Sequence, residues 1–591
     1  MKRGPVFISC LLVIFGLILG AIPGEIGLTA APLVPVCQIQ GSGLTSPRVG
    51  QAVRTQGVVS ADFDAASAKG FFIQTENCDA NPATSDGVFV YLGERLDVVS
   101  VGDLVEVSGT VVEYYGFTEI NVAPTGVQVL AQGQALPAAV ELYPPFDDTQ
   151  SRMYFESLEA MLVAVSLARV VGPTDGQEDT WVVRSDLGLP RVFQDDSAGI
   201  GEIICVGSDG NYEIQPAAKV GDQVQGLRGV LEFSLGTYRL WLLTAPTLIP
   251  AQNPLQEAEE TPELGFTFGT FNLESLFDVV DDPEKDDDVL TSTEYHRKLE
   301  KLALAIHDGL GEPAFVGVQE AENAIVLNHL LAREEIEADY GVVWVDGPDT
   351  RGIDVALLYR HDQVTVLGYE QRQGCTALLD GLGPDGDRNI TDPHNAITCD
   401  TNGDGLLDGN RLFSRPPLVV ELQVDLGEGT ALPVWVLVNH FKSKREDSST
   451  QAYTLTRRLQ QAQFVAGLVS EIYAAHPGAA VIVLGDLNDY PNAQPLAILR
   501  QARLWNAMES VARASRYTYI YQGVSQVMDH VLVSSALAIN WVAAQPAHLN
   551  ADYPYIYRGQ TGIVYRGSDH DPVGVQYRIL PNRIYLPLVA R

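Results

Sequence analysis

Acidic, amide and imidazole side chains follow several apolar segments of this chain. The clearest case is the stretch 481–490, where four apolar residues rich in β-branching predict a buried strand. Gly485 then lets the backbone turn, so that Asp486 and Asn488 emerge at the strand's carboxyl end, where open α/β sheets keep their chemistry. A carboxylate and an amide two residues apart offer a hard cation or an attacking water one charged and one neutral ligand. On spacing alone, an ordinary turn-forming Asp explains the stretch equally well.

Four further polar clusters favour a functional reading. Asn272 follows the apolar run 266–271, and Glu320 ends the run that begins at Phe315. The run 434–438 leads into Asn439, His440 and Lys442, and the pair Asp569-His570 precedes the run 573–575. One polar strand end is common, but five of them predict one convergent site.

Length and charge bound the class of protein. At 591 residues the chain is too long for a single compact domain, so two or three are expected. A formal net charge of -37 argues against general attraction to nucleic acid or anionic membranes. A phosphate-bearing substrate would therefore need local cations and metal ions. The same acidity also suits a solvated extracellular protein.

The N-terminus has the pattern of a secretory signal. Lys2-Arg3 precede an apolar run at 6–22, and small residues around 29–31 offer a cleavage point, so residues 1–31 are predicted to be a signal peptide. An uncleaved anchor is the alternative, which leaves the exported protein either free or attached to the cell surface. In an exported protein, Cys37 with Cys78 and Cys375 with Cys399 are expected to form disulfides, with Cys205 unpaired. The alternative is five plain thiols.

The sequence pattern divides the rest of the chain into regions. Short β-rich runs over 37–140 predict a small barrel or sandwich, and a looser β pattern over 148–250 predicts a second β domain. The run Val101-Gly102-Asp103 is echoed by Val220-Gly221-Asp222, which indicates a weak internal repeat. Residues 251–263 read as a linker, and the apolar tail 581–591 has no assigned role.

Over 264–580, strands alternate with amphipathic helices. Apolar residues recur at helical spacing from Tyr295 to Ile306 and from Leu455 to Ile472, so these helices are expected to lie on the faces of sheets. A four-layer sandwich and a doubly wound sheet both fit this periodicity.

Taken in order, the clusters resemble the motif series of the endonuclease/exonuclease/phosphatase superfamily, whose members include deoxyribonuclease I. The resemblance covers 264–580 and rests on Thr270-Phe271-Asn272-Leu273-Glu274, Val318-Gln319-Glu320, Val438-Asn439-His440-Phe441-Lys442-Ser443, Leu484-Gly485-Asp486-Leu487-Asn488, Met528-Asp529-His530 and Ser568-Asp569-His570. It implies an α+β four-layer sandwich. The region 37–140 resembles the oligonucleotide-binding (OB) barrel that precedes the nuclease domain in some bacterial secreted nucleases, although it is poor in Lys and Arg. We therefore expect one or two small all-β, OB-like domains ahead of the catalytic domain, either gripping nucleic acid or serving only as structure.

The resemblance also implies a role for each residue. Glu320, with Asn272 and Asp569, would hold the metal, and Asp486 would orient or deprotonate the attacking water. Asn488 would hold the phosphate, while His440 and His570 would bind phosphate oxygens or protonate the leaving group; Asp529 would orient one of these imidazoles. Oxygen and amide ligands suit Mg²⁺ or Mn²⁺. The phosphate contacts expected nearby are Asn439, Lys442 and Arg415.

The chain departs from the family pattern at one place. Some members carry a Tyr just before the strand that corresponds to 355–359, but this chain has Arg351-Gly352-Ile353-Asp354 there. The phosphate contact of that Tyr is therefore missing or replaced, and Asp354 is expected to support His440.

A second metal site is expected between Cys399 and Arg415. Asp400, Asn402 and Asp404 stand at alternate positions and are followed by Gly405, with Asp408 beyond, as in the first half of a calcium loop, which predicts a structural Ca²⁺. Arg411 stands where the bidentate Glu of such a loop belongs, so an acidic turn is the alternative.

The leading hypothesis is a secreted, metal-dependent nuclease that acts on DNA, with RNA as a second candidate substrate. No protein partner is inferable, and no membrane span is expected beyond the signal segment. A phosphomonoesterase or a sphingomyelinase-like lipid phosphodiesterase would use the same fold. A non-catalytic binding or adhesion protein is the alternative from another class, but every acid, base and metal ligand that the resemblance requires is present.

Overall fold

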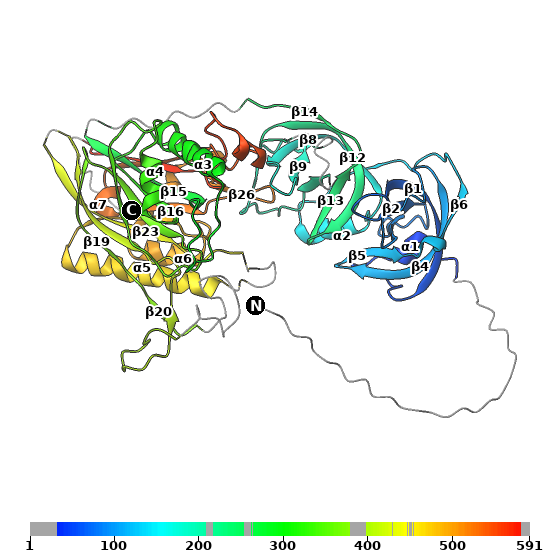
Figure 1. Cartoon of the computed structure of the whole chain (residues 1–591), viewed down its shortest axis with the longest axis horizontal. Helices are drawn as coiled ribbons and strands as arrows, with labels where there is room; N and C mark the ends of the chain where they lie inside the picture. The colour runs from blue at the N-terminus through cyan, green and yellow to red at the C-terminus, as the bar shows by residue number, and fades with distance from the viewer. Residues whose placement is uncertain are drawn as a thin grey trace, which may run out of the picture.

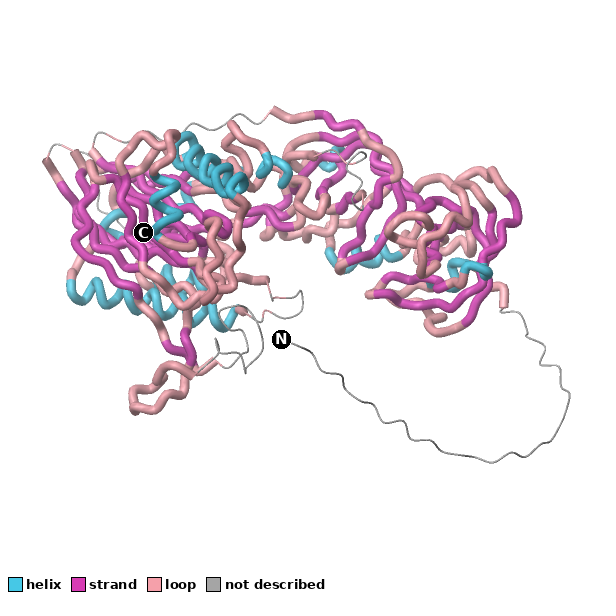
Figure 2. The backbone as a smooth tube through the Cα atoms, viewed as in Figure 1, coloured by secondary structure: helices cyan, strands magenta, loops and turns pink. Residues whose placement is uncertain are grey.

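The computed structural model describes residues 32–208, 215, 217–252, 262, 264–378, 397–427, 429–445, 447, 452 and 454–580. The predicted signal peptide, most of the predicted linker and the apolar tail lie outside these residues. The described parts form two β-barrels and a larger C-terminal domain (Figures 1 and 2). Within them, no helix is long and apolar enough to cross a membrane.

The first barrel is a closed ring of five strands. Its elements are α1 (Val36–Gln40), β1 (Ala52–Phe63), β2 (Gly70–Gln74), β3 (Gly87–Tyr91), β4 (Leu104–Tyr114), β5 (Phe117–Asn121) and β6 (Val127–Ala131), with a 3-10 turn at Pro124–Gly126. The strands pair in the order β1-β2-β3-β5-β4, and β1 pairs with β4 to close the ring; β6 adds to β4. Closure leaves few open edges, and buried valines and Phe71, Ile73 and Ile120 fill the interior.

The second barrel repeats this strand order. It contains β7 (Val140–Glu141), α2 (Asp148–Glu156), β8 (Leu162–Gly172), β9 (Thr180–Arg184), β10 (Val192–Phe193), β11 (Ile204–Gly207), β12 (Gln223–Ser234), β13 (Thr237–Leu242) and β14 (Thr247–Ile249), with a 3-10 turn at Ser185–Leu187. The ring runs β8-β9-β11-β13-β12, β8 pairs with β12, and β14 adds to β12 as β6 adds to β4. The two barrels are thus built on one topology.

The repeated Val-Gly-Asp run takes the same place in both barrels. Gly102 and Gly221, with φ of +89° and +91°, stand just before β4 and β12. Each glycine donates its amide to the first strand of its barrel, at Val59 O and Val170 O, over 2.9 Å. Only glycine adopts this backbone angle without cost, so the run marks the turn that starts the fourth strand of each ring.

The C-terminal domain contains two six-stranded sheets. The first has the order β17-β18-β16-β15-β30-β29 and the second β19-β22-β23-β24-β28-β25. Their bounds are β15 (Gly265–Leu276), β16 (Phe315–Ala321), β17 (Tyr340–Trp344), β18 (Asp354–Arg360), β19 (Val364–Gln371), β22 (Leu418–Asp425), β23 (Ala431–His440), β24 (Ala480–Asp486), β25 (Leu504–Asn506), β28 (Asp529–Ser534), β29 (Trp541–Pro546) and β30 (Val573–Arg578). Because the strands lie in two sheets, the doubly wound single sheet is wrong.

Helices cover the outer faces of the two sheets. They are α3 (Ser292–Leu304), extended by a π-helical turn (Ala305–Gly309), α4 (Ala324–Leu331), α5 (Leu455–Ala475) and α6 (Gln494–Gln501). The short helix α7 (Ser535–Ala538) instead places Leu537 in the core between the sheets, and 3-10 turns lie at Ala507–Ser510, Arg513–Ser515 and Tyr555–Gly559. Residues of α3 and α4 pack on Val316 and Val318, while residues of α5 and α6 pack on Val481 and Val483. Thr291 caps α3 with a capping box that includes Glu294. The prediction of small β domains ahead of a mixed α/β domain is confirmed.

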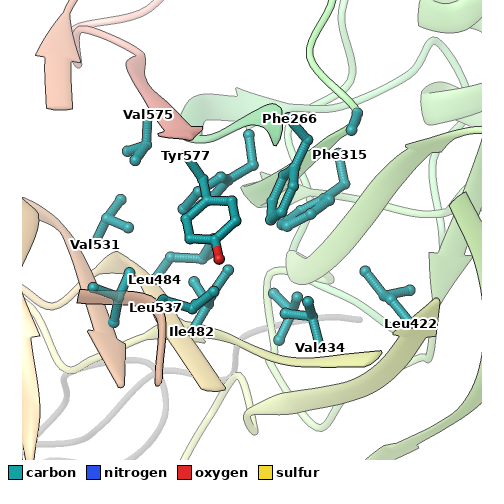
Figure 3. Close-up of a cluster of buried hydrophobic side chains, with 14 of the residues drawn as sticks. Phe266, Phe315, Leu422, Val434, Ile482, Leu484, Val531, Leu537, Val575 and Tyr577 are labelled. Atoms are coloured by element: carbon teal, nitrogen blue, oxygen red, sulfur yellow. The ribbon is translucent and has the colours of Figure 1, made fainter. Parts of the chain in front are cut away.

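The main core lies between the two sheets. Side chains that alternate with the helix-facing ones, such as Phe315, Ile482 and Leu484, meet there with Phe266 and Val531 (Figure 3). Gly317 lets the sheets approach, since a Cβ at this position would lie 2.2 Å from Leu484 Cδ1. The alternation predicted from the strands therefore sorts each apolar run into an inner and an outer face.

The two expected disulfides are present. Cys37 is bonded to Cys78 in the first barrel, and Cys375 to Cys399 in the C-terminal domain, while Cys205 is free and buried. Cys375 lies in β20 (Cys375–Thr376), which pairs with β21 (Asn410–Arg411), so the disulfide and this strand pair tie the acidic loop 400–408 to the domain.

The second barrel is joined to the C-terminal domain by a shared sheet. Strand β10 of the barrel pairs in parallel with β27 (Val524–Gln526), which pairs with β26 (Tyr519–Tyr521). Beside it, Arg191 Nη2 lies 2.7 Å from both carboxylate oxygens of Asp552 and 2.6 Å from the Tyr517 hydroxyl. The two bodies are therefore held by backbone pairing and by a buried ion pair.

Candidate active site

Strand register brings the predicted polar residues together. In the parallel pair β15–β16, Asn272 stands opposite Gln319, next to Glu320. In the parallel pair β23–β24, His440 stands opposite Asp486, and in the antiparallel pair β24–β28, Asp486 stands opposite Asp529. The two sheets thus carry these side chains to one edge of the sandwich.

Asp486 lies at the centre of the cluster. Its Oδ2 accepts hydrogen bonds from Asn272 Nδ2 at 3.2 Å and Asn488 Nδ2 at 3.1 Å, and it lies 3.5 Å from His440 Nε2 and 4.0 Å from His570 Nε2. Burial raises the pKa of Asp486 to about 7, with Asp529 and Glu320 adding to the rise. The carboxylate therefore stands ready to exchange a proton near neutral pH.

Left-handed backbone at non-glycine residues directs several of these side chains. Glu320 and Asn488 have φ of 62° and 50°, and Glu274 and Ser275 form a bulge in β15 with φ of 52° and 53°. Such conformations cost free energy and persist where the surrounding structure fixes them. Gly485, with φ of +129°, is required because a Cβ there would lie 2.0 Å from Asn439 O.

Glu320 is held by this bulge. Its Oε2 accepts bonds from Ser275 N at 2.9 Å and Ser275 Oγ at 3.1 Å, and its Oε1 from Asn272 Nδ2 at 3.2 Å. Burial alone would raise its pKa, but the charges of Arg351 and Arg415 and the hydrogen bond from Asn272 oppose burial and lower the pKa of Glu320. Glu320 is therefore a permanent anion at the site.

The two imidazoles have opposite characters. Burial and the charge of Arg415 hold the pKa of His440 well below its ordinary value, so this ring is neutral. Burial also opposes charge on His570, but Asp529, whose Oδ2 lies 2.7 Å from Nδ1, and the carboxylates of Asp569 and Asp486 raise its pKa well above the ordinary value. His570 is a cation whose Nε2 faces the cluster.

Some predicted residues are engaged elsewhere. Asn439 Nδ2 donates to Leu437 O at 2.8 Å and the residue is fully buried, and Arg415 Nη1 forms a buried ion pair with Asp349 at 3.0 Å. Lys442 is buried, and its backbone amide donates to Gln461. Arg415 Nε is buried and has no hydrogen-bond partner in the described part of the chain. A role of these three residues in phosphate binding stays a prediction.

Asp354 and His440 are not paired in the structure. Asp354 Oδ2 accepts from Gly347 N at 3.0 Å, while Asp354 Oδ1 and His440 Nδ1 are both buried without a hydrogen-bond partner in the described part of the chain. No ion pair within 4.0 Å joins them there. Burial raises the pKa of Asp354 to about 7.

The acidic loop is folded around its own backbone. Asp400 accepts from the amides of Asn402, Gly403 and Gly405 at 2.6–3.0 Å, and Asp408 Oδ1 accepts from Thr401 N at 2.8 Å. Asn402 and Asp404 each accept from the amide two residues on. Structural Ca²⁺ at this loop stays a prediction.

Three contributors were missed by sequence reasoning. Ser275 holds Glu320, Ser568 Oγ donates to Asn272 O at 2.8 Å, and the Tyr519 ring lies 4.8 Å from the His570 ring. Ser568 belongs to the motif Ser568-Asp569-His570, so the sequence offered a signal for its involvement. The sequence around Ser275 and Tyr519 contains no motif that would have indicated a role in the site.

The fit of a divalent cation can be judged from the donors. Carboxylate and amide oxygens suit Mg²⁺ or Mn²⁺. Burial and the carboxylates of Glu274 and Glu320 raise the pKa of Asp569 to about 6, and a cation would relieve this repulsion. The residues therefore fit the ion chemically, although in the described chain no group of three or more His, Cys, Asp or Glu side chains is arranged to hold a metal.

The domain consists of two facing sheets, and at one edge they present buried carboxylates, amides and imidazoles that suit acid–base chemistry. A comparison with known protein families assigns the same domain to a family of hydrolases. Residues 267–377 and 410–551 match the model of the endonuclease/exonuclease/phosphatase family, and residues 137–253 match a domain of unknown function. The C-terminal domain belongs to the endonuclease/exonuclease/phosphatase superfamily, whose members act on phosphodiesters or other phosphate esters.

Among curated proteins no match was found. The similar solved structures include an endonuclease/exonuclease/phosphatase from Bacteroides vulgatus, at 14% identity, covering 53% of this chain and 99% of that one, with a TM-score of 0.34. A mannosyl-6-phosphatase from Bacteroides thetaiotaomicron has 16% identity, covering 52% and 98%, with a TM-score of 0.32. TDP2 from D. rerio, complexed with single strand DNA product, has 16% identity, covering 53% and 98%, with a TM-score of 0.32.

Proposed function

We propose that the protein is a secreted, divalent-metal-dependent nuclease that hydrolyses phosphodiester bonds of DNA, with RNA as a second substrate. The observation that carries this proposal is the position of Asp486, which is hydrogen-bonded to Asn272 and Asn488 and lies within 4.0 Å of both imidazoles. A base beside an acid, next to a fixed anion, is what water attack on a phosphate ester requires.

Asp486 and the two imidazoles take different roles in the proposed reaction. Asp486 accepts a proton from the attacking water, and Asn272 and Asn488 hold its carboxylate in place. His570, kept cationic by Asp529, donates from Nε2 to the leaving oxygen, and neutral His440 donates a hydrogen bond to a phosphate oxygen. Asn488 Nδ2 donates to both Asp486 Oδ2 and Phe441 O, which supports a role for this amide in orienting Asp486.

Glu320, with Asn272 and Asp569, would hold Mg²⁺ or Mn²⁺. When bound, the ion supplies positive charge to the phosphate oxygens. Asn272 already donates to Glu320 and Asp486, so its amide positions both carboxylates whether or not it contacts the ion.

We also propose the finer fold assignments and the location. The helix–sheet–sheet–helix arrangement supports a deoxyribonuclease I-like four-layer sandwich, and the two five-stranded closed rings support OB-like barrels. Two disulfides in separate parts of the chain support an oxidising compartment, and therefore secretion.

The test compares four substrates with the purified full chain. Plasmid DNA, RNA, sphingomyelin and a chromogenic phosphomonoester are incubated with Mg²⁺ and, separately, with EDTA. We expect cleavage of DNA with Mg²⁺, none with EDTA, and none by Asp486→Asn. Asp339→Asn is the matched control, because this aspartate is 86% exposed and lies outside the site.

The alternatives give distinct results in the same experiment. Turnover of the monoester or of sphingomyelin without cleavage of DNA would replace the nuclease with the corresponding phosphomonoesterase or lipid phosphodiesterase. No turnover of any ester would leave a non-catalytic binding protein.

A further inference from the structure

A cavity of about 410 Å³ lies between the second barrel and the C-terminal domain. The barrel supplies Asp175, Asp179, Thr237 and Arg239 to its wall, and the C-terminal domain supplies Tyr519, Arg566 and Asp569. Asp569 belongs to the proposed metal-binding set, so the cavity begins at the active site. Its volume falls in the range of cavities that bind small molecules.

The charges in the cavity nearly cancel. Arg239 Nη2 is paired with Asp179 at 2.6 Å, and Arg566 Nη1 donates to Asn550 O at 3.1 Å. Asp175 and Asp569 bring the carboxylates to three against two guanidinium groups. A second phosphate would therefore meet no excess of positive charge here.

The polar side chains of the wall favour an uncharged polar ligand. The guanidinium groups of Arg239 and Arg566 can donate to hydroxyl or carbonyl oxygens, and the carboxylates of Asp175 and Asp569 can accept from hydroxyl or amino groups. The rings of Tyr519 and Trp181 add flat apolar surface to the same wall.

The walls are fixed before any ligand arrives. Tyr519 lies on β26, which belongs to the sheet shared with barrel strand β10. The same ring packs against the His570 ring, with centroids 4.8 Å apart and the planes tilted by 32°. Gly172 of the barrel packs so tightly on Gly523 that a Cβ would lie 2.7 Å from Gly523 Cα. A preformed cavity of this kind loses little free energy to ordering when it binds.

We propose that this cavity binds the uncharged sugar or nucleoside that is esterified to the phosphate at the active site. The inference rests on the proposed function and deepens it. In this view the second barrel helps to recognise the sugar or nucleoside part of the substrate, while the C-terminal domain acts on its phosphate ester. A nucleoside and a hexose share this chemistry, since both present hydroxyl groups on a ring and carry no charge.

The experiment fills the cavity from the barrel side. Thr237→Trp places an indole in the wall from strand β13, and Gln177→Trp does the same from an exposed loop. Thr247→Trp is the matched control, because Thr247 is an exposed strand residue of the same barrel outside the cavity wall. Trp is well tolerated in strands, so both strand variants are expected to fold.

Two readouts separate this inference from the proposed function. The first is calorimetric binding of free thymidine and of free glucose to the full chain. The second is kcat/KM for the p-nitrophenyl esters of thymidine 5′-phosphate and of methyl phosphate. We expect Thr237→Trp and Gln177→Trp to weaken binding and to lower kcat/KM for the thymidine ester by about tenfold or more, with Thr247→Trp unchanged. The methyl ester should be affected less.

Tighter binding of thymidine than of glucose would identify a nucleoside, and the reverse order a sugar. Equal binding by the wild type and both cavity variants, or no binding of either compound to the wild type, would overturn the inference. If the wild type hydrolyses neither ester but binds one compound in the cavity, the proposed function fails and the cavity assignment stands.

Discussion

Replacing Arg191 by Met should loosen the second barrel from the C-terminal domain. The Arg191 guanidinium contacts both carboxylate oxygens of Asp552 and lies 3.7 Å from the Tyr517 ring centroid, and the side chains of Arg191 and Asp552 are only 12% and 7% exposed. Removing one partner of a buried pair leaves an uncompensated charge, which costs about 3–5 kcal/mol. We therefore expect a loss of that size in the free energy of unfolding.

The assay is urea unfolding of the full chain, with Arg513→Met as the matched control. Arg513 also joins the two bodies, through Asp195 and Asp196, but its side chain is 53% exposed, so its loss should cost no more than about 1 kcal/mol. The double variant Arg191→Met/Asp552→Leu removes both buried charges and should recover much of the stability.

Two results would refute this reasoning. Arg191→Met could prove no less stable than Arg513→Met, in which case the buried pair does not hold the interface. Alternatively, the double variant could be as unstable as Arg191→Met, in which case the loss comes from packing rather than from the stranded carboxylate of Asp552.

Three further predictions concern the site and the first barrel. His440→Ala and Asp486→Ala should each lower turnover by at least ~10² with circular dichroism unchanged, and near-normal activity in either would remove its role. Lys298 Nζ donates to Glu274 O at 3.0 Å and Gly567 O at 2.6 Å, so Lys298→Met should lower stability by about 1–3 kcal/mol and reduce turnover. Equal Tm values for Lys298→Met and wild type would contradict this. Burial raises the pKa of Glu119 to about 7, so the stability that the protonated carboxyl contributes is complete below pH 4.5 and is lost as pH rises through 7. Between pH 4.5 and 8, Glu119→Gln should therefore lose less stability than wild type, by up to about 3 kcal/mol. A difference between the two proteins in urea unfolding that does not change with pH would contradict this prediction.

Much of the site was predictable because each of its main polar residues follows a buried apolar run in the sequence. The apolar runs ending at Asn272, Glu320, His440 and Asp486 become β15, β16, β23 and β24, and buried strands with few polar residues are the pattern that sequence reveals best. Their convergence in one site was predicted from the repeated pattern of polar strand ends. Their distribution over two facing sheets rested on the family resemblance, since periodicity alone left two sheet arrangements open.

The remainder depends on tertiary contacts that leave no local pattern. Strand β10 has two residues, Val192 and Phe193, and exists because β27 lies beside it. The bulge at Glu274 and Ser275 places non-glycine residues at positive φ, which no turn signal announces. Arg191 likewise looks like an ordinary surface cation until Asp552, which lies 361 residues further along, is brought against it.

The shared sheet β10-β27-β26 means that the boundary visible in the sequence is not the boundary along which the molecule separates. Proteolytic nicking within 251–263 would break the chain but would leave β10 paired with β27, and Arg191 with Asp552. The two fragments should therefore migrate together on gel filtration. A C-terminal fragment expressed alone would expose the edge of β27 and a bare carboxylate, which makes aggregation its expected fate.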